Sequence, residues 1–190
     1  MTRIVAGHAR GRTLAVPPRG TRPTADRVRE ALFSALEARM DLDGAAVLDL
    51  YAGSGAVGLE SLSRGASHVL LVENDARAAR VIARNVTTVG LAGAVVRTAT
   101  VAGALSAPPD REYDLVFADP PYAVSDAEVG TALRRLVDGG WLADDALVVV
   151  ERSSRSPETA WPTGLSAVKS WTYGEARVDL ACRDVEQRTD

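Results

Sequence analysis

The chain has 190 residues, 46% of them hydrophobic and 25% charged, which is enough for one domain with a full core. Its longest apolar runs have the length of a strand, far below the ~20 residues that cross a bilayer, and no signal-like apolar segment follows Met1, so we expect a cytoplasmic protein without a membrane partner. The single cysteine, Cys182, has no partner for a disulfide or a metal site, so we expect it to be a small core residue.

The net charge of −3 is distributed unevenly along the chain. Residues 1–40 contain eight arginines and three acidic residues, a balance of +5, and the other 150 residues carry 14 basic and 22 acidic side chains, a balance of −8. A local cluster of arginines can bind a polyanion such as RNA despite a negative total. The alternative is that a composition in which Lys169 is the only lysine scatters arginine everywhere.

Residues 1–23 are expected to form an extended arm, because glycine, proline and arginine alternate there. Two short segments of the arm, 3–6 and 13–16, can pair as a hairpin. A helix capped by Thr24 or Asp26 should follow and end near residue 40. Its apolar face is expected to contain Val28, Ala31, Leu32, Ala35, Leu36 and Met40.

Strands and helices alternate from residue 45 onward, which predicts an α/β fold with a mostly parallel sheet covered on both faces. We interpret the chain as two units: a basic N-terminal extension, residues 1–40, and the α/β domain, residues 41–190. Two segments separated by a two-residue turn, 165–173 and 176–183, are expected to form an antiparallel hairpin at one sheet edge. The other expected strands lie near 45–50, 68–73, 94–98, 113–118 and 146–151, the helices near 56–64, 75–89, 101–106 and 125–138, and a loop at 152–164.

A glycine-rich turn follows the first strand of this alternating region. Gly53, Gly55 and Gly58 match the G-x-G-x-x-G pattern of dinucleotide-binding proteins, so an NAD-dependent oxidoreductase is one interpretation. Asp49 comes shortly before the turn, however, and its carboxylate would repel a pyrophosphate. S-adenosylmethionine (SAM) carries a sulfonium and an ammonium group and no phosphate, so it suits this turn better than NAD.

An acidic residue also ends the second strand. Glu73 follows Gly55 by 18 residues, close to the ~20-residue spacing at which an acid reaches a ribose diol in such folds. The alternative is that Glu73, with Asn74 and Asp75, only caps the next helix. The third strand is followed by Ala99 and Thr100 in place of an acid or amide, so we expect backbone groups to contact adenine there.

The tetrapeptide Asp119-Pro120-Pro121-Tyr122 follows the apolar run 113–118, which is typical of a buried parallel strand. Ligands bind at the carboxyl ends of such strands, and two prolines make the turn stiff. Asp119 and the carbonyl of Pro120 can accept the two hydrogens of an exocyclic amino group, and the ring of Tyr122 can stack on a nucleobase. The alternative is that the prolines merely end the strand and Tyr122 packs on the core.

Taken together, these motifs resemble those of the RsmD-type bacterial 16S ribosomal RNA guanine-N2 methyltransferases. The resemblance implies a SAM-dependent methyltransferase with a Rossmann-like fold, which methylates the N2 amine of one guanosine in 16S ribosomal RNA without a metal. It is most specific in residues 22–33 and nearly spans the chain. The matching stretches are Gly11-Arg12-x-Leu14, residues 22–33, Asp49-x-x-Ala52-Gly53-Ser54-Gly55, Glu73, residues 119–122 and Gly140-Trp141-Leu142.

Motifs and resemblance together predict three groups of site residues. The expected catalytic residues are Asp119, Pro120 and Tyr122. The expected SAM-binding residues are Asp49, Tyr51, Ala52, Gly53, Ser54, Gly55, Glu73 and Asn74. The expected RNA-binding residues are Arg10, Arg12, Arg22, Thr24, Arg27, Arg29 and Pro121.

The tetrapeptide alone does not choose the base, so an adenine-N6 or cytosine-N4 methyltransferase acting on DNA or RNA remains open. The expected partner is 16S ribosomal RNA, free or within the small ribosomal subunit or its precursor. One compact domain acting on so large a partner is expected to be a monomer.

Overall fold

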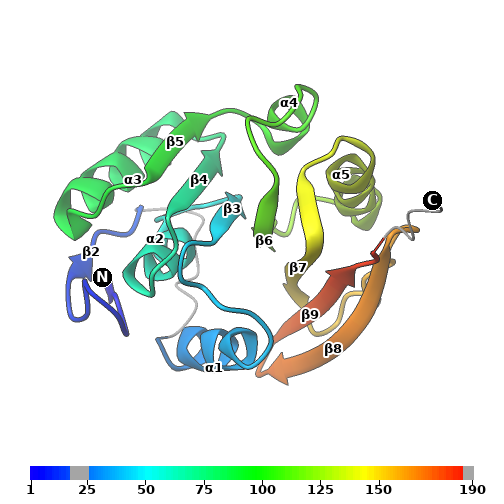
Figure 1. The fold of residues 1–190 in the computed structure, drawn as a ribbon, viewed down its shortest axis with the longest axis horizontal. Coiled ribbons are helices and arrows are strands. Elements are labelled where there is room, and N and C mark those ends of the chain that lie inside the picture. The colour runs from blue at the N-terminus through cyan, green and yellow to red at the C-terminus, as the bar shows by residue number, and fades with distance from the viewer. Residues whose placement is uncertain (18–25, 186–190) are drawn as a thin grey trace.

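The computed structural model describes residues 1–17 and 26–185, in which a seven-stranded sheet is covered by helices on both faces (Figure 1). The strands are β3 (Ala46–Leu50), β4 (His68–Glu73), β5 (Ala94–Thr98), β6 (Tyr113–Ala118), β7 (Leu142–Ser153), β8 (Leu165–Tyr173) and β9 (Ala176–Arg183). Their order is β5-β4-β3-β6-β7-β9-β8. The first five are parallel, and β8 and β9 form an antiparallel hairpin at one edge, as the sequence predicts.

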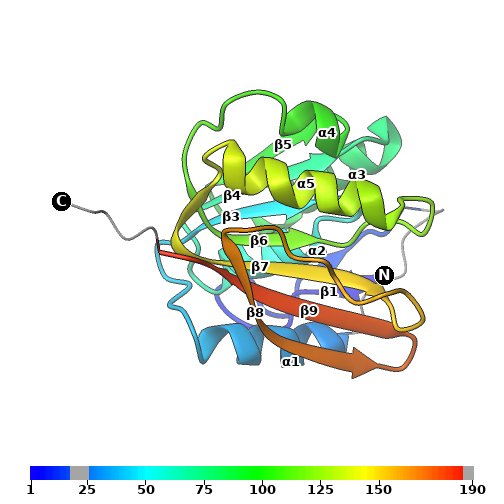
Figure 2. The same ribbon diagram turned by 90° about the vertical axis from the view of Figure 1, so that its right-hand side faces the viewer.

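Helices divide between the two faces of the sheet, which gives the fold its three layers (Figure 2). One face packs against α1 (Asp26–Glu37), α2 (Ala56–Ser63) and α3 (Ala76–Val89), through a core that includes Phe33 and Phe117. The other face packs against α4 (Val101–Ala104) and α5 (Asp126–Asp138), through a core that includes Tyr113 stacked on Trp141.

Each predicted strand and helix is present in the sheet region, and only the ends differ. Helix α4 ends two residues earlier than expected, at Ala104, and β7 begins at Leu142 rather than near residue 146. The β6–β7 register shifts between Tyr113 and Leu115, so the early part of β7 pairs irregularly. The polar pair Asp144 and Asp145 interrupts the apolar pattern there, and the sequence therefore shows only the regular half of the strand.

The N-terminal arm contains the expected hairpin, shortened to two residues on each side: β1 (Thr2–Arg3) pairs with β2 (Thr13–Leu14). Ile4, Ala9 and Leu14 are buried in the same core as α1 and α2. A Cβ on Gly7 would lie only 1.7 Å from the carbonyl oxygen of Ser63, so the arm contacts the end of α2 more closely than any side chain permits. The arm and α1 therefore share one core with the sheet.

Helix α1 buries a face that is rotated slightly from the expected one, with Val28, Ala31 and Ala35 half-buried at its margin. Its buried residues are Arg29, Leu32, Phe33 and Leu36, so the expectation is right for Leu32 and Leu36 and misses the other two. The helix also ends at Glu37, three residues early. The reason is electrostatic: the arm and α2 supply polar partners that allow an arginine to face inward.

Arg29 is 1% exposed, and its guanidinium donates to the Oγ1 of Thr2 (3.2 Å) and the Oδ1 of Asp26 (3.0 Å). Its Nε also lies 3.5 Å from a carboxylate oxygen of the fully buried Glu60. Arg29 is thus held by partners within the protein, although it also belongs to the cleft lining described below, so its expected contact with RNA stays a prediction. Arg29 joins the arm to α1 and α2.

Across residues 1–17 and 26–185, no helix combines the length and apolarity needed to span a membrane. Cys182 is a free thiol that is partly buried and packs against the core, close to the small core residue that the sequence suggests.

Candidate active site

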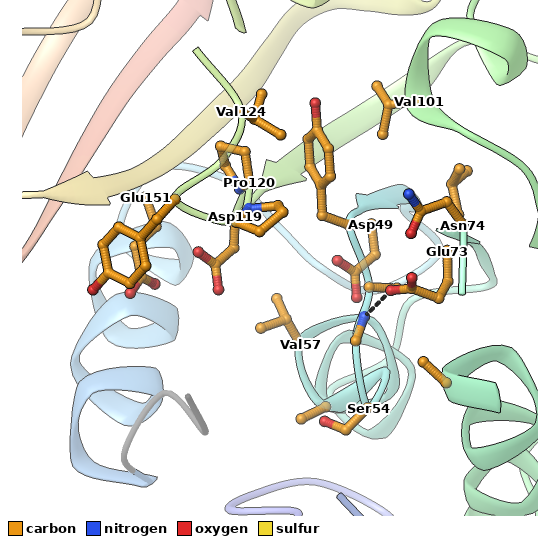
Figure 3. Close-up of a pocket in the computed structure, with 18 of the residues that line it drawn as sticks. Asp49, Ser54, Val57, Glu73, Asn74, Val101, Asp119, Pro120, Val124 and Glu151 are labelled. Atoms are coloured by element: carbon orange, nitrogen blue, oxygen red, sulfur yellow. Dashed lines mark hydrogen bonds between the residues drawn. The ribbon is translucent and has the colours of Figure 1, made fainter. Parts of the chain in front are cut away.

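A cleft of about 660 Å³ opens at the carboxyl ends of β3, β4, β6 and β7 (Figure 3). The chain runs outward from β3 to β4 and β5 in one direction and to β6 and β7 in the other, so the cleft lies where the strand order reverses. Its walls contain every expected catalytic residue and every expected SAM-binding residue except Gly55. Figure 3 shows Asp49, Glu73 and Asn74 at one end of the cleft and Asp119, Pro120 and Glu151 at the other.

Asp49 is the penultimate residue of β3 and is 4% exposed. Its Oδ2 accepts the backbone N–H of Gly58, 2.9 Å away, in the first turn of α2. Burial raises the pKa of Asp49 to about 7, the hydrogen bond from Gly58 opposes the rise, and the charge of Glu73 adds to it. A cationic ligand would relieve this unfavourable burial, whereas a pyrophosphate would aggravate it.

Gly58, the third glycine of the motif, allows α2 to approach the sheet. A Cβ at this position would lie 2.8 Å from side-chain atoms of Leu71 and Val69 and 3.0 Å from the Oδ2 of Asp49. The glycine therefore serves the packing of helix on strand, and its N–H holds the Asp49 carboxylate. Neither role requires a phosphate, which is why the glycine pattern alone did not identify the cofactor.

Glu73 is buried at the end of β4 and fixes two turns at once. One carboxylate oxygen accepts the N–H of Gly53 (2.8 Å), and the other accepts the N–H of Asp75 (2.8 Å). The capping role weighed for Glu73 belongs to Asp75, whose side chain accepts from Arg77 and Ala78 at the start of α3. Because a carboxylate has about four acceptor positions, Glu73 still has capacity for a hydroxyl in the cleft.

The lining between these two acids is mixed in character. Tyr51 has a positive φ of 59°, uncommon for a non-glycine residue, and such strain persists chiefly at functional sites. Ala99, from the loop after β5, and Val101, at the start of α4, present apolar surface, and the side chain of Thr100 caps α4. This end of the cleft therefore fits SAM: carboxylates for a cationic group and a diol, and apolar surface for a flat ring. The described residues contain no group of three or more His, Cys, Asp or Glu placed to hold a metal.

The other end of the cleft holds the tetrapeptide. Asp119 is solvent-accessible on its cleft side, Pro120 is buried, and Tyr122 is 70% exposed at the mouth. Protein surrounds the remaining sides of Asp119, and this burial raises its pKa to about 8, with further contributions from the charges of Glu151 and Asp49. An exposed ring next to a partly buried acid contradicts the interpretation that Tyr122 packs on the core.

Several lining residues were not predicted from the sequence. Glu151, Arg152 and Ser153 come from the end of β7, Ser156 from the following loop, and Glu175 from the turn between β8 and β9. Glu151 carries the same signal that marks Asp49, Glu73 and Asp119, an acid at the carboxyl end of a parallel strand, and could have been found by it. The loop and turn residues carry no such signal, because only the folded hairpin brings them to the cleft.

The expected RNA-binding residues lie partly in the cleft and partly outside it. Pro121 and the buried Arg29 line the cleft, whereas Arg10, Arg12 and Arg27 are exposed and lie outside its lining. Arg12 donates to the backbone carbonyl of Thr88 near the end of α3. Arg22 and Thr24 lie outside the described residues.

Helix α3 adds positive charge beside the arm. Arg77, Arg80 and Arg84 are exposed along one side of a helix that contains no acidic residue. Helix α3 contacts β2, and its first turn adjoins Asp75 at the cleft rim. A basic surface therefore extends along α3 from the cleft to the arm, beyond the arginines that the sequence singled out.

Known proteins share this arrangement over nearly the whole chain. Residues 2–181 match the family described as "Conserved hypothetical protein 95". The chain is 37% identical over 189 residues, 99% of its own length and 93% of the relative's, to the Ribosomal RNA small subunit methyltransferase D of Escherichia coli. It is 37% identical over 176 residues to the protein of that name from Haemophilus influenzae, covering 90% of this chain and 89% of the relative.

A solved structure gives the same result for the fold. The Escherichia coli protein yhhF superposes with a TM-score of 0.84 at 36% sequence identity, covering 97% of this chain and 98% of that one. The chain is therefore a SAM-dependent methyltransferase, and the oxidoreductase alternative is set aside. The chain belongs to the ribosomal RNA small subunit methyltransferase D family.

Proposed function

We propose that this protein transfers a methyl group from SAM to the exocyclic N2 amine of a guanosine in small-subunit (16S) ribosomal RNA. One observation carries the proposal: Asp119, Pro120 and Tyr122 line the same cleft as Asp49 and Glu73. An amine-binding end and a cofactor-binding end thus face each other across one cavity. The names of the Escherichia coli and Haemophilus influenzae relatives support ribosomal RNA as the substrate.

The acceptor amine is a poor nucleophile, because its lone pair is delocalised into the purine ring. In the proposed mechanism Asp119 and the Pro120 carbonyl accept its two hydrogens. These hydrogen bonds strengthen as positive charge develops on nitrogen, which favours the transition state over the ground state. The ring of Tyr122, at the cleft mouth, stacks the base and orients the nitrogen. Asp119, with a pKa raised to about 8, is then a suitable acceptor for the proton that the methylated nitrogen loses.

SAM, when bound, supplies a methyl group on a positively charged sulfur, so no metal or nucleophilic side chain is required. We assign the cationic part of the cofactor to the side of Asp49 and the ribose hydroxyls to Glu73, with adenine against Ala99 and Val101. Tyr51, Ala52, Gly53, Ser54 and Asn74 line the space between. Gly55 lies behind this wall and acts by shaping the turn.

RNA as the partner is supported by the distribution of charge. Arg10, Arg12 and Arg27 are exposed, and the arginines of α3 extend a basic surface to the rim of the cleft. The target base must leave its stack to reach Asp119, and unstacked loop bases are the least costly targets in RNA. We therefore assign the arm and α3 to the RNA backbone and the cleft to one flipped base.

The test is the transfer of labelled methyl from SAM to unmodified small-subunit RNA and to small-subunit particles, followed by digestion to nucleosides. The proposal expects the label in N2-methylguanosine. Label in N6-methyladenine or N4-methylcytosine would support the alternative choice of base and contradict ours. Comparing free RNA with particles identifies the preferred form of the substrate.

A further inference from the structure

Glu151 occupies a position in the cleft equivalent to that of Asp119 on the neighbouring strand. Strands β6 and β7 are parallel, and Ala118 pairs with Val150, so Asp119 and Glu151 follow adjacent positions of the sheet. Both line the cleft, and Figure 3 shows them at the same end. The charge of Glu151 contributes to the raised pKa of Asp119, as expected of carboxylates on neighbouring strands.

The backbone around Glu151 is held rigidly relative to the tetrapeptide. Glu151 pairs with Val178 of β9, and the preceding residue Val150 pairs with both β6 and β9, so the backbone that leads into Glu151 is anchored within the sheet. Its neighbour Arg152 donates to the carbonyl oxygen of Val124 (3.1 Å) and to the Oδ1 of Asp126 (2.7 Å), just beyond the tetrapeptide. A group that discriminates between bases needs such fixed placement, because specificity depends on geometry within about 0.5 Å.

The three bases with an exocyclic amine differ in the ring nitrogen beside that amine. In guanine this nitrogen, N1, carries a hydrogen, so the base presents two neighbouring donors. In adenine and cytosine the corresponding nitrogen carries a lone pair and is an acceptor. Ionised carboxylates only accept hydrogen bonds. A pair of carboxylates therefore complements guanine and repels the other two bases.

We propose that Glu151 is a specificity-determining residue that accepts the N1–H of guanine while Asp119 and the Pro120 carbonyl hold the N2 amine. The inference rests on the proposed guanine-N2 activity and adds the reason for the choice of base. Asp119 alone suits any exocyclic amine, and a second acceptor at Glu151 restricts the site to guanine. Methylation of adenine or cytosine would require a donor at this position instead.

The experiment compares guanosine with 2-aminopurine at the target position. The methylated nucleotide is first mapped with the wild-type protein, and small-subunit RNA is then assembled by ligation with 2-aminopurine in its place. This analogue keeps the N2 amine but has an acceptor at N1. We measure kcat/KM for both RNAs with the wild type, with Glu151→Gln and with the matched exposed control Glu158→Gln.

The wild type and Glu158→Gln are expected to prefer guanosine by about 100-fold or more, because a site built for a donor rejects an analogue that lacks it. Glu151→Gln presents an amide that can donate to N1, so its preference should fall at least about tenfold while SAM affinity is unchanged. An equal loss of activity on both RNAs would indicate a merely structural role for Glu151 and would overturn the inference. If the wild type makes no N2-methylguanosine at all, the proposed function fails first, and this inference fails with it.

Discussion

Asp49 is buried at the cleft, and Asp119 is exposed to the cleft but closely surrounded by protein on its other sides; within residues 1–17 and 26–185 neither carboxylate forms an ion pair. Burial raises the pKa of Asp49 to about 7 and that of Asp119 to about 8, and neighbouring acids contribute to both shifts. Residues with strongly shifted pKa values cluster at functional sites, where a bound ligand can supply the compensating charge. For these two carboxylates the compensating charge is positive, and SAM carries positive charge.

We predict that SAM binding releases protons near pH 7. The positive charge of the cofactor lowers the pKa of Asp49, which is about half protonated at pH 7 in the free protein. Calorimetry of SAM binding in buffers with different ionisation enthalpies measures this release. It should shrink by pH 9, where both carboxylates are already ionised, and should be smaller in Asp49→Asn. A binding enthalpy independent of the buffer at pH 7 would contradict the assignment of Asp49 to the cationic part of SAM.

We also predict that Asp119→Asn stabilises the SAM-free protein. An acid whose pKa is raised on folding binds more protons in the folded than in the unfolded state, so its contribution to stability falls as pH rises from about 4 to about 8. The asparagine variant does not titrate and escapes this loss. Its melting temperature should therefore exceed that of the wild type by an amount that grows from pH 5 to pH 8 and then levels off. A difference that is constant with pH would mean that Asp119 keeps an ordinary pKa.

Among the helices and strands, Glu60 on α2 connects the arm to the glycine-rich turn after β3. Its carboxylate accepts the N–H groups of Val5 (2.8 Å) and Ala6 (3.0 Å) and pairs with Arg64 at 2.9 Å and Arg29 at 3.5 Å. Helix α2 begins directly after Gly55, so the same helix carries the turn at one end and the arm at the other. The orientation of the arm is thereby fixed relative to the cleft.

Glu60→Gln should lower the free energy of unfolding by about 3 kcal/mol or more, because it leaves buried Arg29 and two backbone donors without their acceptor charge. Denaturant unfolding measures the change. Glu37→Gln is the matched control: its side chain is 43% exposed and pairs with Arg64 at 3.0 Å, so its loss should cost less than about 1 kcal/mol. Similar losses in the two variants would argue against Glu60 as the anchor of the arm.

The parallel sheet was predictable because each buried strand is a continuous apolar run that ends in a polar turn, as β6 does before Asp119. The buried face of α1 was not predictable from the sequence, because the burial of Arg29 depends on Glu60, which lies 31 residues further along the chain. The cofactor half of the site follows from local motifs. The wall made by Ser156 and Glu175 was not predictable: the hairpin of β8 and β9 is encoded locally, but no local pattern shows that its turn and the loop after β7 reach the cleft.

At the scale of the whole molecule, the exposed arginines of the arm and of α3 offset an acidic total charge where RNA would approach. Replacing Arg10, Arg12, Arg77, Arg80 and Arg84 by alanine should weaken RNA binding and reduce the slope of log K against log salt by about 0.7 to 0.9 for each RNA phosphate that is no longer neutralised. SAM affinity should not change. The control removes Arg111 and Arg134, which are exposed outside the cleft lining and away from the arm and α3. An equal change of slope per arginine in the control would indicate that RNA binding depends on the total charge of the protein and not on the arginines of the arm and α3.

Single-turnover methyl transfer to small-subunit RNA shows directly whether the cleft methylates a guanine amine that Asp119 holds. The measurement follows N2-methylguanosine formation by the wild type and by Asp119→Asn, with SAM affinity determined on the same samples. We predict N2-methylguanosine in the wild type and a loss of about 100-fold or more in the variant, as for the removal of a transition-state hydrogen bond, with SAM still bound. A variant that retains the wild-type rate, or a wild type that methylates any other position, would contradict the account.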